Sequence, residues 1–215
     1  MRSSVVHHPG EELLLSYASG AAGEAVSLLV ATHLAMCAHC RAAVAGLEAA
    51  GGSLLANVQP VALQKNAYQS VLSRLDAPAA AIVRSAKLAS DVPSPLRPYV
   101  GSDFDAVPWR PITTGIATYP ILKHGKTRAR LIRVVPGAGV AQHTHRGEEW
   151  TLVLTGSFSD ASGTYRAGDV QSTTPAVEHI PTADPGPICI NLAVTDAPLV
   201  FRGLIPKIAG KIFGF

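Results

Sequence analysis

A group of histidines and cysteines in the first 40 residues has the side-chain types and the spacing of metal ligands. His33, Cys37 and Cys40 stand at positions i, i+4 and i+7, so one face of a continuous helix would carry all three. Imidazole and thiolate ligands suit zinc, whose structural sites are tetrahedral and need a fourth ligand. We predict that His7 or His8, upstream of the first helix, supplies it. The alternative is a redox-active or buried cysteine pair beside an incidental histidine.

A second set of candidate ligands lies in the C-terminal half. His143 and His145 are two residues apart, which places both side chains on one face of a strand, and Glu149 follows shortly after. Together with Gly137 and Gly156, these residues match the first sequence motif of the cupin barrels in every spaced position. The pattern therefore resembles a cupin, with the two histidines pointing into the mouth of the barrel.

The second cupin motif should add one more histidine, and His179 is the candidate. Its distance from Gly168 agrees with the cupin pattern, whereas Pro175 is displaced by one position and the usual interior glycine is absent. With this residue the barrel site has three histidines and one carboxylate, a set that suits zinc, iron, manganese or nickel by ligand type. The alternative is a group of polar residues that line a barrel without metal. The complete predicted site is His143, His145, Glu149 and His179.

The elements that must position these residues change character along the chain. Apolar residues recur at three- and four-residue steps in residues 10–90, which predicts three or four helices that share a small core. The segment from Glu24 to Ala50 is one long helix or two joined near the cysteine pair. A proline-rich stretch follows, and beyond it short runs of alternating apolar residues between turns predict strands. The predicted fold is two domains: an all-α small helical bundle (residues 1–88), a proline-rich linker (89–107) and an all-β cupin barrel (108–215).

Composition and charge exclude several classes of protein. Hydrophobic residues make up 47% of the 215 residues and charged residues only 15%, so the chain buries much of itself. Basic and acidic residues nearly balance in both halves, which argues against direct DNA binding. The sequence shows neither an apolar run long enough for a membrane span nor a secretory signal, and we expect a cytoplasmic protein.

Two further features are interpreted as structural. The basic run from Lys123 to Arg133 is read as a solvated strand face rather than a nucleic-acid site. Cys189 lies in the strand-like segment ICINLAV, where we predict a buried, inert thiol. The alternative for this residue is a thiol near the metal that responds to oxidants.

The order of the two ligand sets resembles the zinc-binding anti-sigma factors of the ChrR type, in which a helical zinc domain precedes a cupin. The phrases LLLSYASG, VATHLAMCAHCRA, GGSLL and VTDAPLVF are similar to that family, and the likeness covers nearly the whole chain. The resemblance implies that His8 rather than His7 completes the zinc site with His33, Cys37 and Cys40. It also implies that the barrel site holds a divalent metal, with zinc first.

The resemblance further implies that the protein is a transcription regulator. Such proteins bind one extracytoplasmic-function (group IV) sigma factor, in a 1:1 complex, and release it on oxidative stress from singlet oxygen or peroxide. We expect the apolar anchors of the sigma-binding surface among Leu13, Leu14, Tyr17, Leu28 and Leu29.

Two other functions compete with this interpretation. The first is a metal-dependent cupin enzyme, a dioxygenase or isomerase, with a helical accessory domain. The second is a ligand-binding cupin with a helical dimerisation domain. The enzyme hypothesis offers few further acid or base groups in the strands and leaves the helical half without a role.

Overall fold

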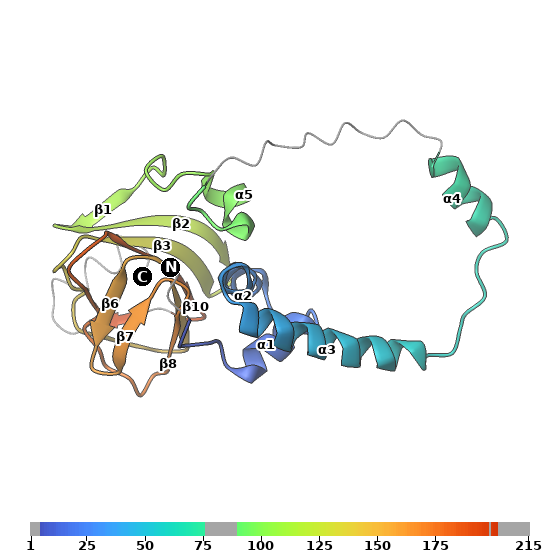
Figure 1. The fold of residues 1–215 in the computed structure, drawn as a ribbon, viewed down its shortest axis with the longest axis horizontal. Coiled ribbons are helices and arrows are strands. Elements are labelled where there is room, and N and C mark those ends of the chain that lie inside the picture. Colours follow the sequence, from blue (N-terminus) through green and yellow to red (C-terminus); the bar gives the residue numbers. More distant parts are fainter. Residues whose placement is uncertain (1–4, 76–89, 198, 202–215) are drawn as a thin grey trace.

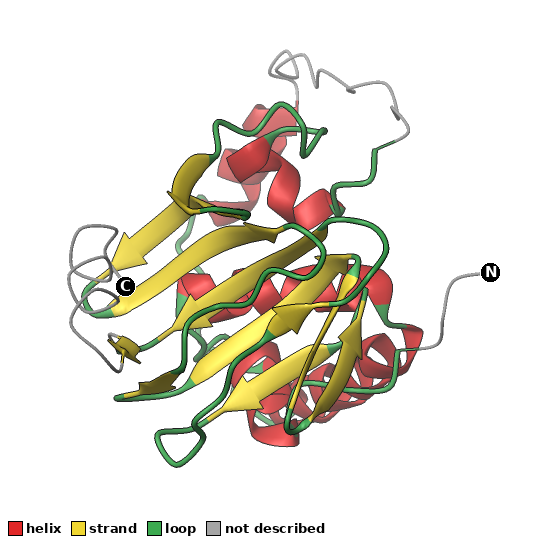
Figure 2. Cartoon of the chain, turned by 90° about the vertical axis from the view of Figure 1, so that its left-hand side faces the viewer, coloured by secondary structure: helices red, strands yellow, loops and turns green. Residues whose placement is uncertain are grey.

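The computed structural model describes residues 5–75, 90–197 and 199–201. The expected fold class, a helical region followed by a cupin-like β domain, is confirmed. The predicted boundary at residues 88 and 89 lies outside the described residues. The helices are α1 (Glu11–Ala18), α2 (Glu24–Met36), α3 (Ala38–Ala56), α4 (Ala67–Leu75), the 3-10 helix η1 (Ser94–Leu96) and α5 (Arg97–Val100). Helix α2 lies against one side of a β-barrel, with α1 and the first half of α3 beside it (Figure 1; Figure 2).

The β domain contains a six-stranded antiparallel sheet in the order β1-β2-β3-β10-β5-β8, a three-stranded sheet β7-β6-β9 and the pair β11-β4. Its central strand, β10, is buried at every residue. The strands are β1 (Arg110–Thr113), β2 (Ile116–His124), β3 (Thr127–Val134), β4 (His143–His145), β5 (Glu149–Thr155), β6 (Ser157–Asp160), β7 (Gly163–Arg166), β8 (Val170–Thr173), β9 (Thr182–Ala183), β10 (Cys189–Thr195) and β11 (Leu199–Phe201).

The two faces of the large sheet bury different kinds of side chain. Leu192 of β10 is paired with Leu131 of β3 on one side and with Leu152 of β5 on the other, so three fully buried leucines form a row. This row lies on the outer face, which α2 covers. Side chains of β10 alternate between the two faces, so Cys189 and Asn191 face the barrel interior while Leu192 faces outward.

The helices and the sheet share one apolar core rather than two. Leu14, Leu28 and Leu29 belong to the same cluster as the leucines of the sheet. These three residues were expected among the anchors of a partner surface, and that expectation is wrong because all three are buried against the protein itself. Leu13 and Tyr17 are partly buried beside the same cluster.

The second half of α3 and the whole of α4 project away from this core (Figure 1). The expectation that α4 shares the helical core is wrong, because none of its residues is buried. Its apolar residues are exposed, as are those of the preceding segment: Leu54, Leu55, Val58, Val61, Leu63, Tyr68, Val71, Leu72 and Leu75. Within the described residues, no helix is both long and apolar enough to cross a bilayer.

The proline-rich segment after residue 90 packs on α2. Val92 and Leu96 are fully buried in the shared core, and Phe104 also joins it. Tyr99 Oη donates a hydrogen bond of 3.0 Å to the Glu24 carboxylate at the start of α2. This segment is therefore part of the contact between the helices and the sheet.

We expect Leu29→Ala to destabilise the whole molecule, because Leu29 is fully buried where α2 crosses the sheet. The free energy of unfolding should fall by about 2–5 kcal/mol, as for other buried leucines. Urea unfolding followed by circular dichroism measures the change. Leu55→Ala is the matched control in α3, where Leu55 is 73% exposed and the loss should stay within about 0.5 kcal/mol. Equal losses in both variants would contradict the shared core.

Candidate metal centres

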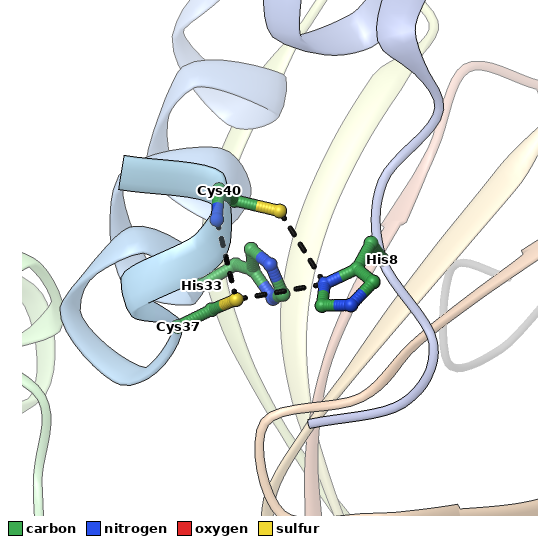
Figure 3. A group of neighbouring side chains, drawn as sticks. All are labelled: His8, His33, Cys37 and Cys40. Carbon is green, nitrogen blue, oxygen red and sulfur yellow. Dashed lines mark hydrogen bonds between the residues drawn. The ribbon is translucent and has the colours of Figure 1, made fainter. Parts of the chain in front are cut away.

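The N-terminal segment and helices α2 and α3 bring four predicted ligands together (Figure 3). The ligand atoms of His8, His33, Cys37 and Cys40 all lie within 4.8 Å of one another, and we call this group the helical cluster. His8 Nδ1 lies 3.5 Å from Cys37 Sγ and 3.4 Å from Cys40 Sγ. Two sulfur and two nitrogen donors at this separation have the composition of a tetrahedral zinc site.

The helix breaks at Cys37, between α2 and α3, so the three ligands do not lie on one continuous helix. Cys37 has an extended backbone (φ −116°, ψ 111°) and is the N-cap of α3. Its sulfur accepts a hydrogen bond of 3.4 Å from the backbone N–H of Cys40. The break therefore places the sulfur of Cys37 at the positive end of α3.

His33 is oriented toward the cluster by a carbonyl group of the β domain. Its Nδ1–H donates to the oxygen of Gly168 at 2.9 Å, because a carbonyl can only accept. The other ring nitrogen, Nε2, is buried and has no hydrogen-bond partner among the described residues. Burial lowers the pKa of His33 to about 4, so the ring is neutral at physiological pH. A neutral imidazole with one nitrogen hydrogen-bonded and the other facing two sulfurs is the arrangement of a metal ligand.

The structure distinguishes the two N-terminal histidines. His8 lies in the helical cluster. His7 turns to the β domain instead, where its Nδ1 is 3.5 Å from a carboxylate oxygen of Asp169 and its ring packs on Tyr165. His39, between the two cysteines, is exposed and lies outside the cluster.

The second group of ligands lies inside the barrel. Ligand atoms of His143, Glu149 and His179 are within 4.8 Å of one another and all three side chains are buried; we call this group the barrel cluster. His143 and His179 are cross-strand neighbours, and their Nε2 atoms are 3.2 Å apart. His145 follows His143 in β4 as the spacing predicts, and its side chain lies outside the described residues.

Hydrogen bonds orient both histidines of the barrel cluster. Nδ1–H of His143 donates to the carbonyl of Ala141 at 2.8 Å, and Nδ1–H of His179 donates to the carboxylate of Asp160 at 2.8 Å. In their neutral forms the two rings thus direct the lone pairs of Nε2 toward each other. Burial lowers the pKa of His143 to about 4, which disfavours a proton there. A cation between the rings would relieve this repulsion, so the donor set suits a metal ion.

Glu149, the carboxylate of the barrel cluster, interacts electrostatically with the buried side chain of Arg130. Burial raises the pKa of Glu149 to about 7, and the positive charge of Arg130 acts in the opposite direction. Arg130 itself is buried, and burial lowers its pKa to about 10. The basic run from Lys123 to Arg133 is therefore not a purely solvated face, because Arg130 points into the barrel.

Two aspartates that the sequence analysis did not predict as site residues support the clusters. Asp160 accepts the hydrogen bond of His179; burial alone would raise its pKa, but hydrogen bonds from Ser162, Gln171 and His179 outweigh it and lower the pKa. Asp169 accepts backbone hydrogen bonds beside the helical cluster. Asp169 follows the glycine of the second cupin motif, whereas no local signal marks Asp160.

Cys189 is fully buried on the inner face of β10, as predicted. Its sulfur lies 3.5 Å from the side-chain oxygen of Asn191, and burial raises its pKa to about 11. The thiol is therefore protonated at physiological pH and a poor nucleophile.

Comparisons with known proteins agree on one family. The family described as the ChrR Cupin-like domain matches residues 99–197. The anti-sigma-E factor ChrR of Cereibacter sphaeroides is 40% identical over 98% of this chain and 99% of its own length. Among solved structures, the complex of Rhodobacter sphaeroides SigE with the anti-sigma ChrR contains a chain that is 40% identical, with a TM-score of 0.80, over 89% of this chain and 99% of that one.

We expect Asp160→Ala to weaken metal binding at the barrel cluster, because His179 would lose the acceptor that fixes its orientation. Loss of such a partner costs about 10- to 100-fold in metal affinity. Competition for Zn²⁺ against a chelator measures the affinity. Asp184→Ala is the control, since the Asp184 carboxylate accepts hydrogen bonds from Ser157 and Ser159, away from the barrel cluster, and its removal should leave the affinity unchanged. Unaltered affinity in Asp160→Ala would show that the carboxylate does not support a metal ligand.

Proposed function

The chain belongs to the ChrR family of anti-sigma factors, and we propose that it binds an extracytoplasmic-function sigma factor and holds it away from RNA polymerase. The observation that carries the proposal is the similarity, at 40% identity and a TM-score of 0.80, to a ChrR chain solved with SigE bound. The similarity extends over the helical half as well as the barrel. A cytoplasmic location follows from this role, because sigma factor and polymerase meet there.

The sigma-binding surface that we propose is the exposed apolar face of α4, with the second half of α3. Tyr68, Val71, Leu72 and Leu75 stand at positions i, i+3, i+4 and i+7, so they share one side of α4. Exposure of such an apolar stripe to water is unfavourable and marks an interaction surface. An amphipathic helix commonly binds by placing its apolar face in the apolar groove of a partner. This surface replaces the buried leucines that the sequence had suggested.

We propose that the helical cluster binds zinc. The two thiolates and two imidazoles would fix the N-terminal segment, the end of α2 and the start of α3 in one arrangement. When bound, zinc supplies the positive charge that keeps both thiols deprotonated. Burial and the neighbouring Cys37 raise the pKa of Cys40 to about 12, so the Cys40 thiol stays protonated without such a cation.

We propose that the barrel cluster binds a divalent metal, zinc first, and takes part in release of the sigma factor under oxidative stress. His143, Glu149 and His179 are the described ligands, and His145 is the fourth ligand that the motif implies. The shared core and the packed segment after residue 90 connect this half to the helices. A structural change inside the barrel would thus be transmitted to the helical half through packed side chains.

The alternative, a metal-dependent dioxygenase or isomerase, is less well supported. The full-length relative is named as an anti-sigma factor. An enzyme would also leave two features without a role, the helical cluster and the exposed face of α4.

The direct test is size-exclusion chromatography of the full chain with the extracytoplasmic-function sigma factor encoded nearest its gene, with zinc counted in each peak. We expect a 1:1 complex. In Cys37→Ser/Cys40→Ser, zinc should fall by one ion per chain and the complex should weaken, because two of four ligands of the helical cluster are lost. His39→Ala is the control, since His39 is exposed next to the cluster. Absence of a complex with folded, zinc-loaded protein would favour the enzyme or ligand-binding alternatives.

A second prediction concerns α4. Val71→Glu/Leu75→Glu should weaken sigma binding by at least about 30-fold, roughly 2 kcal/mol, because two apolar anchors become charged. Stability should not change, since α4 buries no residue. Ser70→Glu/Ser73→Glu adds the same charge to the opposite side of the helix and should bind normally. Titration calorimetry gives the affinities; equal losses in both double variants would exclude the apolar face as the contact.

A further inference from the structure

The turn between β7 and β8, residues 167–169, meets the helical half at the helical cluster. The carbonyl of Gly168 accepts the hydrogen bond of His33 Nδ1. Next to it, Asp169 Oδ1 accepts hydrogen bonds from the backbone N–H groups of Val6 at 2.8 Å and His7 at 3.0 Å. The barrel thus contacts both histidine ligands of the helical cluster, one directly and one through the residues that precede it.

We propose that Asp169 is a positioning residue for the helical cluster: by binding the backbone of residues 6 and 7, it places His8 beside the two cysteines. This inference rests on the proposed metal binding of that cluster. It means that the barrel half completes a metal site whose ligands all come from the helical half. No ligand of the site belongs to the turn itself.

The N-terminal segment needs such a contact because it has no regular structure of its own. Residues 5–10 form neither helix nor strand, and α1 begins only at Glu11. Fixing free backbone in one conformation costs conformational entropy. The two hydrogen bonds to Asp169, and a third backbone bond of 3.0 Å from Val170 N–H to the carbonyl of His7, offset that cost.

The surroundings of Asp169 fix its carboxylate as a hydrogen-bond acceptor for the N-terminal segment. Its side chain is 4% exposed, and its second oxygen accepts a hydrogen bond of 2.9 Å from the backbone N–H of Arg166, which fixes the carboxylate within the turn. Burial alone would raise its pKa, but the hydrogen bonds from His7, Arg166 and Val6 outweigh it and lower the pKa. The group is therefore a carboxylate that accepts three N–H groups, and hydrogen bonds to a charged acceptor are the stronger kind.

Gly168 lets the segment approach closely. Its φ of +99° is one that residues with a side chain rarely adopt, and a Cβ placed there would lie 2.6 Å from Cγ2 of Val5. The same Cβ would also touch Met36 at the end of α2. The glycine of the second cupin motif is thus needed for contact with the helical half as well as for the turn.

The strand that follows connects this turn to the barrel cluster. Gln171 of β8, two residues after Asp169, donates a hydrogen bond of 2.8 Å to Asp160, which also holds His179. The supports of the helical cluster and of the barrel cluster are therefore two residues apart on one stretch of chain. A displacement of β8 would disturb both.

The test uses the full chain titrated with Co²⁺ in place of zinc. Thiolate-to-cobalt charge-transfer absorption reports only the helical cluster, because the barrel cluster contains no cysteine. Asp169→Ala should lower the Co²⁺ affinity of this absorption about 10- to 100-fold, the range for loss of a residue that orients a ligand. Asp169→Asn should lose less, because its amide oxygen still accepts from Val6 and His7 while its amide nitrogen cannot accept from Arg166. Asp184→Ala, a carboxylate removed elsewhere in the β domain, should titrate like the natural chain.

The outcomes separate the inference from the function on which it rests. If the natural chain gives no thiolate-to-cobalt absorption, the proposed metal binding of the helical cluster is wrong. If it does, and the Asp169 variants keep its full affinity, the positioning role of Asp169 is wrong. Circular dichroism checks folding, and Asp169→Asn alone decides the matter if Asp169→Ala does not fold. A graded loss confined to the thiolate signal supports the proposal.

Discussion

Burial of the outer face of the large sheet is the constraint on which the rest of this structure depends. The leucine row of β3, β10 and β5 would be exposed to water if α2 did not cover it, and Leu29 of α2 would be exposed as well. Apolar burial of this kind is the dominant favourable term in folding. It explains the low content of charged residues, and it explains why a strand such as β10 is apolar on the outside while its inner face carries Asn191 and Thr195. Because the helices are docked on the barrel, two sites that are distant in the sequence lie within one packed body.

Both candidate metal centres follow the same local rule. In each, a histidine donates its Nδ1–H to a fixed oxygen: Gly168 for His33, Ala141 for His143 and Asp160 for His179. The other ring nitrogen then carries no proton, and its lone pair faces the other metal-ligand atoms of the cluster. The acceptors differ in origin, since two belong to the backbone and one is a buried carboxylate. The chemistry of both centres therefore depends as much on these oxygens as on the ligands themselves.

Residue spacing predicted part of each ligand set, because spacing within a helix or strand fixes the face on which a side chain lies. It predicted His33 with the two cysteines, and His143 with Glu149 and His179. The choice of His8 came from the family resemblance instead, and the side chain of His145 lies outside the described residues. Spacing did not predict the break at Cys37, because a helix that ends at a capping sulfur and restarts keeps nearly the same periodicity. Asp160 and Asp169 were missed because their partners, His179 and the backbone of residues 6 and 7, come from other parts of the chain. Periodicity likewise marked Leu14 and Leu28 as apolar positions but carried no information on whether the protein or a partner would cover them.

The backbone hydrogen bond between Val170 and His7 has a consequence for the outer edge of the large sheet. β8 is its last strand, and an open strand edge is a template for pairing with another chain. The N-terminal segment lies along that edge and occupies one of its donors. Detachment of the segment would therefore do more than remove His8 from the helical cluster: it would also expose a donor on an edge strand that is otherwise paired with the N-terminal segment.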